Sequence, residues 1–76
     1  MSYGALTVLL ARAHAACEVA RREAEREGAA EKYELGYAQR WLALAVTRHR
    51  EANRIEPEAF QAQVDLARRG FEGMAS

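Results

Sequence analysis

Two series of apolar residues, each with alternating spacings of three and four, restrict what this chain can fold into. One lies within the first 27 residues, and the other lies between residues 31 and 53. The members are Leu6, Leu10, Ala13, Cys17, Ala20 and Ala24 in the first series, and Leu35, Ala38, Leu42, Ala45, His49 and Ala52 in the second. This spacing forms one stripe, or seam, along an α-helix and is typical of helices packed lengthwise. We therefore predict an all-α fold.

Gly28 separates the two seams and is the first residue suited to end a helix. A helix continuing through Gly28 would cost only about 1 kcal/mol relative to alanine, so the break is not strongly marked. Continuation, however, would place Glu27, Glu31 and Glu34 in the seam, which argues against one long coiled coil. We therefore expect a long antiparallel hairpin folded about residue 29.

The hairpin is expected to have a first helix over about 3–27 and a second helix over about 31–53. Folding about residue 29 brings small side chains of the two seams opposite one another. The expected layers are Ala20 with Ala38, Cys17 with Leu42, and Ala13 with Ala45. Alanine facing alanine would allow the two axes to approach to about 8 Å.

A third, shorter helix is indicated by the segment IEPEAF. Pro57 suits the first position of a helix, because its missing N–H is not needed there. Ile55 and Phe60 have the spacing of a hydrophobic staple. Gly70 is expected to end this helix, which would cover about 57–69.

The second helix also has an apolar series away from its seam. Tyr33, Tyr37 and Trp41 recur every fourth residue, and Leu44 follows on the same side at about 100° per residue. The third helix spans about 20 Å. Running back along the second helix, it would shelter Leu44 and at most Trp41 in addition. The two tyrosines would then either lie half-buried with their hydroxyls in water or contact a partner.

The composition indicates that a single chain can form only a small hydrophobic core. Hydrophobic residues make up 50% of the 76 residues, but 17 of these 38 are alanine. Chains of this size often need a disulfide, a metal or a partner subunit, and the single cysteine, Cys17, excludes a disulfide within the chain. We therefore expect one small helical domain over residues 1–76, completed by a second copy as a homodimeric helical bundle.

These features favour a small non-enzymatic protein–protein interaction module, such as an adaptor, an assembly factor or a protein inhibitor. Tyrosine, tryptophan and arginine dominate the energetics of interfaces. The predicted partner-binding residues are Tyr33, Tyr37, Trp41, Leu44, Arg40 and Arg48. The expected partner is another protein, a second copy of the chain, or both. One alternative is a purely structural subunit whose aromatic series is buried in contacts between copies of the chain.

A second alternative is a small regulator that binds nucleic acid. Basic residues on one side of the second helix would contact phosphates. They are Lys32, Arg40, Arg50 and Arg54. Against this reading, the net charge is zero, and Glu56 and Glu58 at the start of the third helix would repel DNA.

No motif for catalysis, metal binding or membrane insertion is recognisable. His14 can share a metal with Cys17 or with Glu18, but two ligands do not make a zinc site. We therefore predict no catalytic residue, no metal and no cofactor. No apolar run approaches the roughly 20 residues of a membrane span. The start of the chain lacks the basic residues of a signal peptide, and we expect a cytoplasmic protein.

Overall fold

Three helices make up the part of the chain that the structure describes. The computed structural model describes the backbone of residues 4–75 and the side chains of residues 4–73. Its helices are α1 (Ala5–Glu27), α2 (Glu31–Asn53) and α3 (Pro57–Ala75), and no strand occurs within residues 4–75. The prediction of an all-α fold is confirmed. The expected start of the first helix falls on Tyr3, which lies outside the described residues.

Gly28 ends α1 through backbone geometry that glycine adopts without strain. Its φ is 68°, in the left-handed region. The N–H of Gly28 donates to the carbonyl of Glu25 at 3.2 Å, and the N–H of Ala29 donates to that of Ala24 at 2.8 Å. This pair of bonds is the Schellman motif, which satisfies carbonyls that the helix end would leave unpaired. The chain therefore reverses direction after Gly28 and enters α2.

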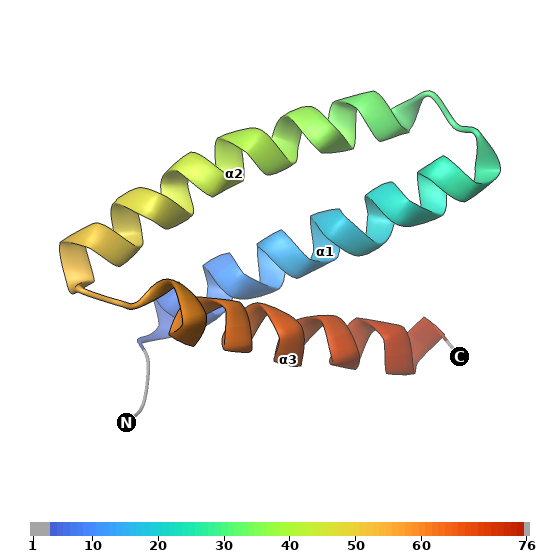
Figure 1. Ribbon diagram of the computed structural model, residues 1–76. Helices are drawn as coiled ribbons and strands as arrows, with labels where there is room; N and C mark the ends of the chain where they lie inside the picture. Colours follow the sequence, from blue (N-terminus) through green and yellow to red (C-terminus); the bar gives the residue numbers. More distant parts are fainter. Residues whose placement is uncertain (1–3, 76) are drawn as a thin grey trace.

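α1 and α2 lie side by side and run in opposite directions (Figure 1). At the open end of this hairpin, Thr7 Oγ1 lies 2.7 Å from His49 Nε2. Nearer the turn, Arg21 Nη1 donates to Gln39 Oε1 at 3.4 Å. The residue numbers in these two pairs average 28 and 30. The hairpin is therefore folded close to residue 29, as predicted.

The faces that α1 and α2 turn toward each other differ in part from the predicted seams. Several seam members are exposed, namely Leu6, Ala20, Ala38, Ala45 and Ala52. In α2, Gln39 and Val46 are turned inward in place of Ala38 and Ala45, so the expected alanine layers do not form. Burying valine removes more apolar surface from water than burying alanine, which favours this rotation of the helix.

α1 is the central helix of the molecule. It packs against α2 on one side and α3 on another, whereas α2 and α3 have little direct contact (Figure 1). The core cluster combines Ala11 and Ala15 of α1 with Val46 of α2 and with Phe60 and Val64 of α3. Because alanine is small, α1 allows both neighbouring helices to approach closely.

α3 packs along α1 and does not run back along α2. The prediction that the third helix covers Leu44 and at most Trp41 is therefore wrong. The apolar face of α3 contains Phe60, Val64, Ala67 and Phe71, all of which belong to the core or pack against it. The small residues on α1 offer this face a closer approach than the aromatic series of α2 would. Leu44 and Trp41 consequently remain exposed.

An ion pair outside the core also joins α3 to α1. Arg68 Nη1 donates to Glu18 Oε2 at 2.9 Å, and Arg68 also contacts Asp65. The hydrogen bond to Glu18 raises the pKa of Arg68 above its usual value, and the charge of Asp65 acts in the same direction. Arg68 is therefore held in its charged form between these carboxylates.

α3 also continues past Gly70, where the sequence predicted its end near residue 69. Within residues 4–75 only Gly28 and Arg54 have positive φ, so Gly70 remains helical. Phe71 lies seven residues after Val64, and continuing the helix places its ring against the core. Full burial of such a side chain contributes about 1.5–3 kcal/mol, and Phe71, which is partly buried, gains a share of it. This share offsets the cost of about 1 kcal/mol for a glycine inside a helix.

Candidate functional site on the outer face of α2

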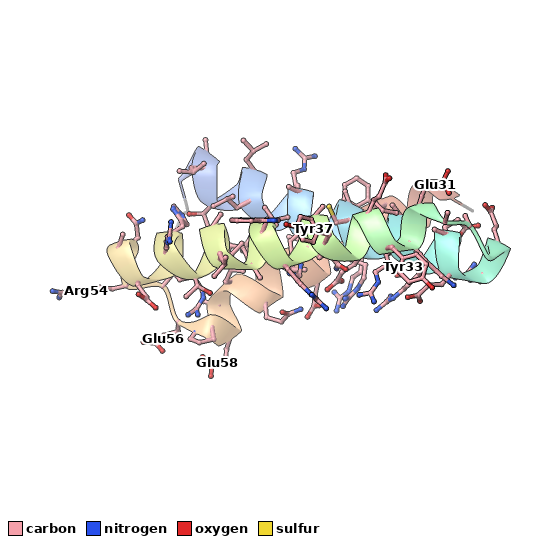
Figure 2. All side chains as sticks on the ribbon, turned by 90° about the horizontal axis from the view of Figure 1, so that it is seen from above. Glu31, Tyr33, Tyr37, Arg54, Glu56 and Glu58 are labelled. Carbon is pink, nitrogen blue, oxygen red and sulfur yellow. The ribbon has the colours of Figure 1, made fainter. Side chains whose placement is uncertain are left out.

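The side of α2 opposite α1 is covered by no other helix of the described chain. It contains Tyr33, Tyr37, Trp41 and Leu44, which we call the aromatic face. Their exposed fractions are 74%, 61%, 60% and 52%. Tyr33 and Tyr37 lie along α2 (Figure 2). The sequence correctly indicated that these residues point away from the seam, and the position of α3 leaves all four uncovered.

Contacts between neighbouring side chains organise the aromatic face. The rings of Tyr37 and Trp41 meet edge to face, with centroids 6.2 Å apart and planes inclined by 70°. Lys32 Nζ lies 5.3 Å from the centre of the Tyr33 ring, within the range of a cation–π contact. Such contacts restrict the rotamers of large side chains, which lowers the entropy that binding must remove.

An open hollow borders the aromatic face on the side of α1. Tyr33, Tyr37 and Arg40 line it together with Arg21 and Gly36. Gly36 has no side chain, and a Cβ built there would lie 3.4 Å from the guanidinium carbon of Arg21. The glycine inside α2 therefore allows an α1 guanidinium to lie close to the α2 backbone. The hollow combines aromatic rings with the charge of Arg40 and with Arg21, which is paired with Glu25 at 3.3 Å.

The two arginines predicted to flank the aromatic face are both exposed. Neither Arg40 nor Arg48 forms an ion pair with another residue among residues 4–73. Arg40 lies at one margin of the face, in the hollow. Arg48 follows Leu44 by four residues and extends the same side of α2. Both guanidinium groups are thus available to an acidic group of a partner.

The basic residues proposed for nucleic acid are not equally available. Arg50 is partly buried, and its Nη1 donates to the carbonyl of Ile55 at 3.3 Å. Lys32 is partly buried and lies over the Tyr33 ring. Arg40 and Arg54 are exposed. The four side chains therefore do not form one uniform stripe of solvated charge.

Several exposed residues beside the aromatic face were not assigned to a site from the sequence. Glu34 precedes Tyr37 by three residues and is exposed, and no ion pair joins it to another of the described side chains. Ala38 and Ala45 were assigned to the seam but lie exposed next to Trp41. A heptad count through Glu34, Tyr37 and Trp41 would have indicated this second stripe.

The described residues contain no arrangement of groups suited to metal binding. No cluster of three or more histidine, cysteine, aspartate or glutamate side chains occurs among them. His14 Nδ1 is 3.6 Å from Glu18 Oε1, and Glu18 is occupied by Arg68. Cys17 is a partly buried free thiol. Within the same residues, none of the helices has the length and apolarity required to cross a membrane.

Comparisons of the chain with protein-family models, with curated proteins and with solved structures find no match. The aromatic face therefore has to be interpreted from its own chemistry.

Proposed function

We propose that the protein is a non-enzymatic interaction module that binds a protein partner through the aromatic face of α2. The observation that carries this proposal is the exposure of Tyr33, Tyr37, Trp41 and Leu44 on the one side of α2 that has no neighbouring helix. Large contiguous apolar patches are rare on the surfaces of monomeric proteins, and where they occur they mark interaction sites. An adaptor, an assembly factor and a protein inhibitor all fit this proposal, in a cytoplasmic setting.

The chemistry of the face supports a protein partner in particular. Tyrosine and tryptophan supply large contact areas with few rotatable bonds, and arginine pairs with carboxylates at the rim. Arg40 and Arg48 stand beside the rings without ion-pair partners among residues 4–73. A homodimer that completes a helical bundle belongs to the same proposal, because a second copy presents the same face.

Nucleic acid is supported less well. The engagement of Arg50 with the Ile55 carbonyl and of Lys32 with the Tyr33 ring withdraws two of the four proposed phosphate contacts. The net charge of zero supplies no general attraction to a polyanion.

The test compares the double variant Tyr37→Ala/Trp41→Ala with the control Leu66→Ala, which truncates an apolar side chain that is 62% exposed on α3. Each is immobilised and used to capture proteins from cells in which the chain is made, and self-association is measured by light scattering. We expect the double variant to keep its helical circular dichroism and to lose at least about tenfold in captured partner or in self-association. Leu66→Ala should behave like the wild type. Equal binding by all three proteins contradicts the proposal.

A further inference from the structure

The aromatic face is part of a longer exposed stripe whose members are spaced three and four residues apart. The stripe consists of Glu34, Tyr37, Trp41, Leu44 and Arg48, and all five are exposed. This is the spacing of a helix that packs lengthwise against another helix. The stripe has an acidic residue at one end, a basic residue at the other and Trp41 in the middle.

We propose that the occupant of this stripe is α2 of a second copy of the chain, packed antiparallel about a two-fold axis at Trp41. This inference rests on the proposed function and names the partner. In an antiparallel pair centred on residue 41, each residue faces the one whose number brings the sum to 82. Trp41 therefore meets Trp41 of the second copy, and every other contact occurs twice.

Side-chain size favours this arrangement. Tyr37 lies at the level of Ala45 of the second copy, and Leu44 lies at the level of Ala38, so on both sides of the central tryptophan pair a large residue shares its level with a small one. Ala38 and Ala45 are exposed beside Trp41 in the structure and are free to take this role. A parallel pair would instead place each residue against its own copy, with rings against rings and alanines against alanines. Interdigitation of large and small residues fills space better.

Charge complementarity favours the same arrangement. Glu34 and Arg48 both lie seven residues from Trp41, which is about 10 Å along the helix. The antiparallel pair places Glu34 of one copy against Arg48 of the other at both ends of the contact. Neither side chain has an ion-pair partner of its own among residues 4–73. The parallel pair would bring Glu34 against Glu34 and Arg48 against Arg48, which is repulsive.

Charge reversal tests the arrangement through the dimer dissociation constant, measured by analytical ultracentrifugation. The variants are Glu34→Arg, Arg48→Glu and the double variant with both changes. The control is Arg69→Glu, which reverses an exposed arginine on α3. We expect each single reversal to raise the dissociation constant by at least about tenfold. The double variant should return it close to the wild-type value, and Arg69→Glu should leave it unchanged.

Cross-linking tests the same geometry without relying on charge. In a Cys17→Ala background, a mixture of Glu34→Cys chains and Arg48→Cys chains should form a mixed disulfide on mild oxidation. Each variant alone should remain uncross-linked, because an antiparallel pair separates each of these positions from its own copy by about 21 Å along the axis. Efficient self-cross-linking of both single variants would indicate a parallel pair and overturn the inference.

The remaining outcomes separate this inference from the function on which it rests. A wild-type chain that stays monomeric, but loses a captured protein when Tyr37 and Trp41 are truncated, overturns the second copy and keeps the proposed function. A dimer that is weakened by Trp41→Ala but is indifferent to all charge reversals overturns the antiparallel order. A dimer that is indifferent to Trp41→Ala overturns the second copy as the occupant, and the proposed function is overturned as well if truncating Tyr37 and Trp41 also leaves protein capture unchanged.

Discussion

Two residues with positive φ end the first two helices, and only one of them is glycine. Gly28 has φ 68° and Arg54 has φ 54°. Both are followed by the bond typical of a Schellman stop: the N–H of Ala29 bonds to Ala24, and the N–H of Ile55 bonds to the carbonyl of Arg50 at 2.9 Å. A side chain with a Cβ is strained in this region by about 1–2 kcal/mol. The end of α2 thus holds strain that the end of α1 avoids.

Replacing Arg54 by glycine should relieve that strain. We expect Arg54→Gly to raise the free energy of unfolding by about 0.5–1 kcal/mol, since glycine loses part of the gain through the greater entropy of the unfolded chain. Gly28→Ala is the matched control of opposite sign and should lower it by about 1 kcal/mol. Urea unfolding followed by circular dichroism measures both changes. Equal and neutral effects would show that these two helix ends carry no backbone strain.

At the scale of the helices, rotation about the axis decides which residues form the core. α1 carries alanines on several sides, and the structure buries Ala15 at 0% exposure while it leaves Ala20 exposed. Ala20 belongs to the predicted seam and Ala15 does not. The reason is that α1 has to accommodate α3 as well as α2, so its buried side includes the contact with Phe60 and Val64. Seam spacing alone describes a helix with one neighbour.

Enlarging each alanine distinguishes the two sides of α1. Ala15→Leu inserts three carbons into a filled core and should lower the free energy of unfolding by about 1–3 kcal/mol. Ala20→Leu has the same change in an exposed position and should stay within about 0.5 kcal/mol of the wild type. Both values come from urea unfolding at one protein concentration. A larger loss for Ala20→Leu than for Ala15→Leu would restore the predicted seam and contradict the observed rotation.

At the scale of the molecule, the helices form an open row with α1 in the middle (Figure 1). The described chain measures 39 × 26 × 18 Å, and its core cluster consists of two alanines, two valines and one phenylalanine. Small domains with so few buried residues are marginally stable by themselves. Association through the aromatic face would remove further apolar surface from water and would couple folding to assembly.

This coupling predicts a melting temperature that depends on protein concentration. Anything that binds only the folded chain stabilises it by mass action, so the midpoint of a dimer rises as concentration increases. We expect the wild-type midpoint to rise over an about hundredfold concentration series and the Trp41→Ala midpoint to stay constant. Differential scanning calorimetry gives both series. Parallel, concentration-independent midpoints would show that self-association through Trp41 does not contribute to stability.

The sequence by itself determined the features that depend on local interactions. Helix propensity, the glycine at 28 and the proline at 57 act through residues within about four positions, and the predicted range 31–53 coincides with α2 as observed. The same local periodicity placed Tyr33, Tyr37 and Trp41 on a side of α2 away from its seam. The candidate site was therefore recognisable as a group of residues before any tertiary contact was known.

Only the tertiary structure decided how the helices are turned and where α3 lies. Val46 enters the core instead of Ala45, α3 covers α1 and leaves Leu44 exposed, and Phe71 carries the helix past Gly70. Each of these features depends on how side chains that are distant in the sequence bury one another. No local sequence pattern therefore predicts them. Packing energy among several helices is a property of all their faces together, whereas helix formation is a property of each segment alone.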